Sequence, residues 1–162
     1  MTLVTEHLEH LGVAFEVLPH VRTETALEQA MALRLDPATV LKAVVLVSAT
    51  GPAIAIVDAS SRVDLDLVRE ALDDPTVILA SEAEIARAYP EFEPGALPAL
   101  PSLLHVPVVI DPMALAQARV TIAAGVQRES IRLRPTDLLR GGAVMTASIA
   151  RSLQGERSPA MA

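Results

Sequence analysis

Lys42 is the residue whose type and position most clearly suggest chemistry. It is the only lysine in the chain, against twelve arginines, and it lies inside the apolar run 39–47. That run is rich in β-branched residues and is typical of a buried strand. An ammonium is costly to bury, and its pKa moves easily on burial. Lys42 therefore either points into a cleft and meets an anion or a developing negative charge, or keeps its stem on the core and its head in water.

Other familiar catalytic motifs are missing. The chain has no Gly-rich phosphate loop, no Gly-x-Gly-x-x-Gly after a strand and no Gly-x-Ser-x-Gly elbow. It has no cysteine, which excludes a thiolate nucleophile and a Cys-ligated zinc. Its four histidines are spread out. His7 and His10 could bridge a metal from one helix face, but two solvated histidines are the simpler expectation. We predict neither a metal nor a cofactor.

The elements that must position Lys42 are an alternation of helices and strands. Thr25 followed by Glu28, and Ser81 followed by Glu84, are capping boxes, and Asp64 is a further helix cap. The apolar runs 39–47 and 53–59 flank a short Gly-Pro loop and predict an antiparallel hairpin. The remaining predicted helices cover 2–11 and 136–140, and the remaining predicted strands cover 13–18, 77–79, 108–110, 119–123 and 130–133. This mixed order indicates an α+β fold with mainly antiparallel pairing rather than a doubly wound parallel sheet.

Three segments carry more specific expectations. The helix after Thr25 is predicted to bury Ala26, Leu27, Ala30, Met31 and Leu33. Five prolines in residues 90–107 exclude a helix or a central strand there and indicate a long functional loop. We expect one domain over residues 1–142 and a fraying tail over 143–162.

Composition and charge limit the classes of partner that the chain is expected to bind. The 162 residues suit one domain, and the net charge is −7. Residues 1–100 hold sixteen acids and six bases, whereas residues 101–162 hold four acids and seven bases. Such a chain is a poor general binder of nucleic acids, and we expect no DNA partner. Five arginines either make a small local contact with phosphates or are ordinary solvated charges: Arg119, Arg128, Arg132, Arg134 and Arg140. No signal peptide or membrane-length apolar run is visible, so a cytoplasmic protein without a membrane partner is expected.

An ordered set of motifs resembles a known family. The set consists of His20, the helix capped by Thr25, Val40-Leu41-Lys42, Glu93-Pro94-Gly95-Ala96-Leu97-Pro98, Val108 to Asp111, Ala123-Ala124-Gly125 and residues 131–139. In this order, over roughly residues 5–140, the chain is similar to the YbaK family of aminoacyl-tRNA deacylases, whose domain is also associated with prolyl-tRNA synthetases.

The resemblance implies a fold and an activity. The fold is a mixed, mainly antiparallel sheet curled into a barrel-like shape, with helices outside. The activity is metal-free and cofactor-free hydrolysis of the ester between a wrong, small amino acid and the terminal adenosine of a tRNA, with tRNA for proline as one candidate. It implies Lys42 as the catalytic residue, as an oxyanion partner or a phosphate anchor. The implied substrate-binding residues are His20, Thr25, Ala43, Gly95, Ala96, Pro98, Ala123, Gly125 and Ser130.

Two departures leave two functions open. Ala43 stands where family members often carry a small polar residue, and Ser130 where some carry an acid. The first hypothesis is a free-standing editing hydrolase acting on the acceptor end of a mischarged tRNA, with an aminoacyl-tRNA synthetase as a further partner. The second is a non-catalytic module of the same fold that binds an aminoacyl group, a nucleotide or a protein.

Overall fold

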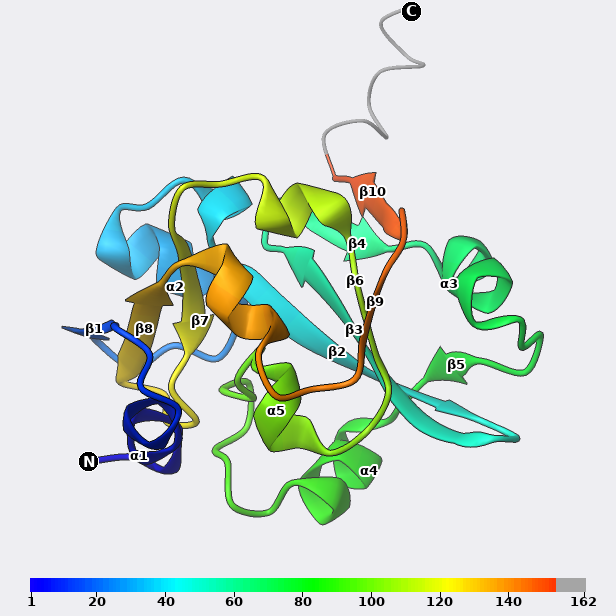
Figure 1. The fold of residues 1–162 in the computed structure, drawn as a ribbon, viewed down its shortest axis with the longest axis horizontal. Coiled ribbons are helices and arrows are strands. Elements are labelled where there is room, and N and C mark those ends of the chain that lie inside the picture. The colour runs from blue at the N-terminus through cyan, green and yellow to red at the C-terminus, as the bar shows by residue number, and fades with distance from the viewer. Residues whose placement is uncertain (154–162) are drawn as a thin grey trace, which may run out of the picture.

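A long hairpin carries Lys42. The computed structural model describes residues 1–153, and Figure 1 shows the hairpin of β2 (Leu41–Ser48) and β3 (Gly51–Asp58) at the centre. The two strands pair antiparallel along their full length, with Lys42 opposite Val57. The predicted hairpin is confirmed.

Three more strands complete a five-stranded sheet in the order β5-β2-β3-β6-β9. Strand β5 (Ile78–Leu79) is antiparallel to β2, while β6 (Val108–Ile110) and β9 (Val144–Thr146) add parallel strands beyond β3. A second sheet holds β1 (Glu16–Pro19), β8 (Glu129–Leu133) and β7 (Val120–Ala123), all antiparallel. A bridge between Val40 and Thr121 joins the two sheets. Strands β4 (Ser61–Val63) and β10 (Ala150–Ser152) form a separate antiparallel pair.

The helices are short and surround these sheets (Figure 1). They are α1 (Leu3–His10), α2 (Ala26–Leu33), α3 (Leu65–Leu72), α4 (Glu82–Ala88) and α5 (Pro101–Leu104). Short 3₁₀ turns occupy Pro37–Thr39, Pro112–Leu115 and Pro135–Leu139. The predicted α+β class with mainly antiparallel pairing is confirmed, and the barrel-like curl stays a prediction. No helix within residues 1–153 is long and apolar enough to cross a membrane.

Alternation along β2 divides the core. Leu41 and Val45 pack into the larger cluster with the β7 and β8 residues, whereas Leu46 and the partly buried Val44 pack with Val68 of α3. Side chains on a strand alternate between its faces. Lys42 therefore shares the α3 side of the sheet with Val44, and Ala43 faces the other side.

The caps predicted from sequence form with one difference. Ser81 and Glu84 make the reciprocal capping box of α4. The Thr25 hydroxyl accepts a hydrogen bond from the Glu28 amide at 3.1 Å, but the Glu28 carboxylate accepts from the amide of Glu24 rather than Thr25. Asp64 caps α3 as predicted, through the amides of Asp66 and Leu67.

Three sequence expectations are corrected. Residues 101–104 form α5 inside the proline-rich loop, because Pro101 stands at the first helical position, where a missing N–H costs nothing. In α2, Met31 is 74% exposed, while Gln29 is buried with Ala26 and Ala30.

The fraying expected from residue 143 is wrong for residues 144–152, which form β9 and β10. The buried Asp111 carboxylate accepts hydrogen bonds from the amides of Ile149 and Ala150, both at 2.9 Å. The last part of the expected tail, 154–162, lies outside the described residues.

Candidate functional site

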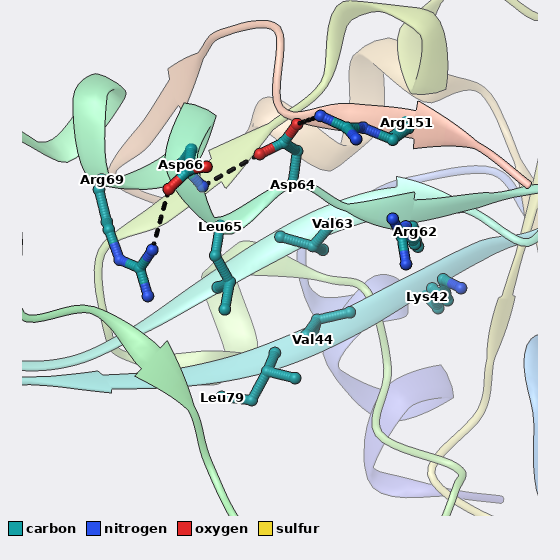
Figure 2. A pocket seen from close by; sticks show the side chains of 10 residues that line it. All are labelled: Lys42, Val44, Arg62, Val63, Asp64, Leu65, Asp66, Arg69, Leu79 and Arg151. Carbon is teal, nitrogen blue, oxygen red and sulfur yellow. Dashed lines mark hydrogen bonds and ion pairs between the residues drawn. The ribbon is translucent and has the colours of Figure 1, made fainter. Parts of the chain in front are cut away.

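Lys42 lines two cavities. The first, of about 450 Å³, we call the small-residue pocket, because five of its lining residues are alanine or glycine: Ala26, Ala43, Ala59, Gly95 and Ala123. Its larger aliphatic walls are Leu27, Leu41, Val45, Ile85 and Leu97, and its other polar lining residues are Glu24, Thr25 and Gln29. The second, of about 530 Å³, we call the cationic pocket. Figure 2 shows its lining, which includes Lys42, Arg62, Arg69 and Arg151. Among the described residues, Lys42 is the one that lines both.

The Lys42 ammonium has no hydrogen-bond or salt-bridge partner among the described residues. No buried side-chain nitrogen or oxygen of residues 1–153 lacks a partner, so its Nζ is reachable by solvent. Burial lowers the pKa of Lys42, and the carboxylate of Asp58 opposes that shift. Asp58 is itself held by Ser60 and Ser61. A half-buried ammonium that has no partner among the described residues is suited to bind an anionic group, whose charge would offset the cost of its burial.

Gly95 forms one rim of the small-residue pocket. The amide of Ala96 donates to the carbonyl of Glu93 at 3.0 Å, and Gly95 has φ +75°. Pro94 and Gly95 thus stand at the two central positions of a type II turn, the second of which favours glycine. A Cβ at Gly95 would lie 1.9 Å from the Glu24 carbonyl oxygen. The turn therefore rests directly on the backbone that leads into α2.

Gln127 holds that rim in place through hydrogen bonds. This buried residue donates from Nε2 to the Pro94 carbonyl at 2.7 Å, and its backbone amide donates to the Glu93 carboxylate at 2.7 Å. Its side-chain oxygen accepts from Nε of Arg22, and its backbone carbonyl accepts from the Thr23 amide. One residue of the β7–β8 turn thus holds together the 93–95 turn and the 22–23 segment.

A chain of hydrogen bonds runs from the surface to the small-residue pocket. His20 Nε2 lies 2.8 Å from the hydroxyl of the fully buried Ser130, which donates to the Gln29 side-chain oxygen at 3.0 Å. The other ring nitrogen of His20, Nδ1, lies 2.6 Å from the Val21 carbonyl oxygen. Gln29 lines the pocket. Ser130 therefore orients the Gln29 amide at the pocket wall.

The structure separates the ten residues expected at the site into three groups. Thr25, Lys42, Ala43, Gly95 and Ala123 line the small-residue pocket. His20 and Ser130 stand behind it and connect to it through Gln29.

The third group, Ala96, Pro98 and Gly125, neither lines the pocket nor connects to it through Gln29. Ala96 and Pro98 are buried, and the Ala96 amide is used within the turn. Gly125 lies under Phe92, whose ring carbon would be 2.8 Å from a Cβ there. Position 125 requires a glycine because of that packing and because its φ is +83°.

Sequence reasoning missed the two buried glutamines and the cationic pocket. Gln29 and Gln127 are each less than 10% exposed, which is unusual for glutamine. Their positions on an apolar helix face and in a turn were the available signals. The four cations of the second pocket come from β2, β4, α3 and β10, and no local pattern unites them. Within residues 1–153, no group of three histidines or carboxylates is placed to hold a metal ion.

Comparisons with known proteins establish the family and the fold. The family model of the aminoacyl-tRNA editing domain matches residues 20–140. No curated protein sequence matches the chain. Among solved structures, the hypothetical protein APE2540 is 19% identical with a TM-score of 0.82, over 91% of this chain and 99% of that one. A protein proposed as a trans-editing enzyme for prolyl tRNA synthetase is 24% identical with a TM-score of 0.79, over 92% of this chain and 95% of that one. These two likenesses show the fold, and the matched family model shows that the chain belongs to the aminoacyl-tRNA editing domain family.

Proposed function

We propose that the chain is a free-standing hydrolase that deacylates a mischarged tRNA carrying a small amino acid. The observation that carries the proposal is that Lys42 and Gly95 line one cavity together with four alanines. In a domain of the editing family, such a cavity fits a small aminoacyl group.

Lys42 would act on the ester carbonyl or on the adjoining phosphate. Water attacks the carbonyl carbon of the ester, either before or after the acyl group has moved to the neighbouring ribose hydroxyl, and negative charge develops on the carbonyl oxygen. A positioned ammonium stabilises that charge, by an amount that mutagenesis of comparable donors puts at about 10²–10³ in rate. The attacking water loses a proton, the bond between the acyl carbon and the ribose oxygen breaks, and the ribose oxygen takes up a proton. The products are the free amino acid and uncharged tRNA.

Polar groups at the wall are available to the amino group of the substrate. The Glu24 carboxylate is more than half exposed and forms a salt bridge with Arg22, with 3.0 Å between Oε1 and Nη2. The Gln29 amide is held by Ser130, and the Thr25 hydroxyl is at the same wall. Ala43 contributes no hydrogen bond, so recognition of the amino group falls to Glu24, Thr25 and Gln29.

The size of the walls limits the amino acid. The aliphatic residues Leu27, Ile85 and Leu97 line the cavity with four alanines, and no aromatic residue lines it within the described chain. A hydrophobic pocket separates substrates that differ by a methylene by only about 1–3 kcal/mol. We therefore expect a preference among small amino acids rather than absolute selection of one.

The test is deacylation of a panel of aminoacyl-tRNAs by the wild type and by Lys42→Ala. The panel holds alanyl-, cysteinyl-, seryl- and threonyl-tRNA, each on its cognate tRNA and on tRNA for proline. Release of one amino acid, lost in the folded Lys42→Ala variant, supports the hydrolase and names its substrate. Absence of release from every member would leave the non-catalytic binding module as the function.

A further inference from the structure

The two buried glutamines use their side-chain amides differently. Both ends of the Gln127 amide are occupied, because Nε2 donates to the Pro94 carbonyl and Oε1 accepts from Nε of Arg22. For Gln29, the oxygen alone has a partner among the described residues, the Ser130 hydroxyl at 3.0 Å. Gln29 Nε2 makes no hydrogen bond within residues 1–153, so both of its N–H groups are available to a ligand.

The free amide nitrogen of Gln29 is open to the small-residue pocket. Gln29 is only 4% exposed, yet no buried side-chain nitrogen of the described residues lacks a partner, so Nε2 is reachable by solvent. Because Gln29 lines the small-residue pocket, that cavity offers the opening. A donor at a site buried to this extent is costly to leave unpaired. The pocket therefore presents a hydrogen-bond donor that an acceptor on a bound molecule would satisfy.

The position of this donor is fixed by two elements. Gln29 belongs to α2, where its backbone amide donates to the Thr25 carbonyl at 3.0 Å. Its side-chain oxygen is held by the fully buried Ser130 of β8, which determines the end of the amide that remains free. The oxygen has a second lone pair, so it can still accept from the amino group of a substrate.

Burial separates the polar residues that line the pocket. Glu24 and Thr25 are exposed, whereas Gln29 is buried. The exposed Glu24 carboxylate suits the charged amino group, which every aminoacyl ester carries. The side chain of the amino acid, which is the part that differs between substrates, would then extend toward the buried wall that contains Gln29.

We propose that Gln29 Nε2 donates a hydrogen bond to a side-chain hydroxyl of the substrate, so that the protein prefers seryl and threonyl esters to alanyl and cysteinyl esters. The proposal rests on the hydrolase function above and adds the class of amino acid to it. Alanine offers no acceptor and the sulfur of cysteine is a weak one, so either would leave the donor poorly paired. The aliphatic walls alone cannot make this distinction, because a hydrophobic pocket rejects an added hydroxyl only weakly.

The test compares seryl- and alanyl-tRNA built on the same tRNA, because the two substrates differ by one hydroxyl. The value of kcat/KM on each, corrected for spontaneous hydrolysis, is measured for the wild type and for Gln29→Met, which keeps the length of the side chain and removes the amide. Gln117→Met is the matched control, because Gln117 lines neither cavity. The ratio of the two values within one preparation does not depend on the folded fraction of the protein.

We expect the wild type to favour seryl- over alanyl-tRNA by about tenfold, as for one hydrogen bond. Gln29→Met should bring this ratio to about one, mainly by slowing the release of serine. Gln117→Met should keep the wild-type ratio. Cysteinyl-tRNA, whose side chain has nearly the shape of serine, should be cleaved by the wild type at a rate closer to that of alanyl-tRNA.

The outcomes separate this proposal from the function it rests on. If the wild type releases no amino acid from any of these tRNAs, the hydrolase function and the role of Gln29 both fail. If the wild type is active but cleaves alanyl-tRNA as fast as seryl-tRNA, or if Gln29→Met keeps the wild-type ratio, the role of Gln29 alone is overturned. The wild-type ratio needs no variant, so it can overturn that role even if Gln29→Met does not fold.

Discussion

Replacing Gly95 by alanine tests the contact that shapes the pocket rim. Gly95 has φ +75°, and an added Cβ would lie 1.9 Å from the Glu24 carbonyl oxygen and 2.6 Å from its carbon. Both neighbours are backbone atoms and cannot rotate away. Gly12 is the matched control, because it has φ +71° and no atom within 4 Å of a Cβ.

The two substitutions share one cost and differ in another. The left-handed backbone costs an alanine about 1–2 kcal/mol at either position. The reduced entropy of the unfolded chain offsets part of that cost equally in both. The overlap with Glu24 adds about 1–3 kcal/mol at Gly95 alone. For a domain of this size each kcal/mol corresponds to roughly 2–4 °C in Tm, so Gly95→Ala should melt several degrees below Gly12→Ala.

The same displacement should reduce activity. To relieve the overlap, the turn at Gly95 or the Glu24 backbone must move, and either movement changes the rim of the small-residue pocket. A misplacement of about 1 Å can cost 10²-fold in rate. The assays are thermal unfolding and deacylation of the substrate that the panel identifies. Equal melting temperatures for the two variants, or full activity in Gly95→Ala, would refute the reasoning about this rim.

Three further substitutions test the buried polar groups. Burial lowers the pKa of Lys42, so the folded protein binds the lysine proton less tightly than the unfolded chain does. Lys42→Met should therefore raise the free energy of unfolding measured in urea near pH 7. This gain should shrink as the pH rises toward the ordinary lysine pKa of about 10.4. Asp111→Ala removes a carboxylate that accepts three backbone amides, and it should cost about 2–4 kcal/mol and selectively speed hydrogen exchange in residues 144–152. Gln127→Ala should raise KM more than it lowers kcat, because it releases the 93–95 turn without touching the reacting groups; unchanged KM would contradict the clamp.

The sequence predicts those elements whose causes are local. The caps at Ser81 and Asp64 and the hairpin around Lys42 depend on residues a few positions apart, and each forms as expected. The turn at Gly95 likewise depends on neighbouring residues, Glu93-Pro94-Gly95-Ala96. Local patterns could therefore place Lys42 on a central strand and Gly95 in a turn.

Features decided by distant partners could not be predicted. The face of α2 depends on Ser130, which lies 101 residues away and binds Gln29, whereas the alanine-rich helix is apolar on several sides. The strands after residue 143 depend on Asp111, nearly forty positions earlier. The sequence resemblance implies that Gly125 binds substrate, but the Phe92 side chain packs over it. The cationic pocket needs four separate elements, and no single segment carries its pattern.

A single-turnover rate measures whether Lys42 performs the deacylation. With enzyme in excess over the identified aminoacyl-tRNA, the rate of amino-acid release is measured for the wild type and for Lys42→Ala, and Tm is measured for both. The account predicts a fall of about 10²-fold or more in Lys42→Ala, with a Tm that is not lowered. An equal rate in the two proteins would contradict it, and the chemistry would then have to be assigned to other groups of the pocket.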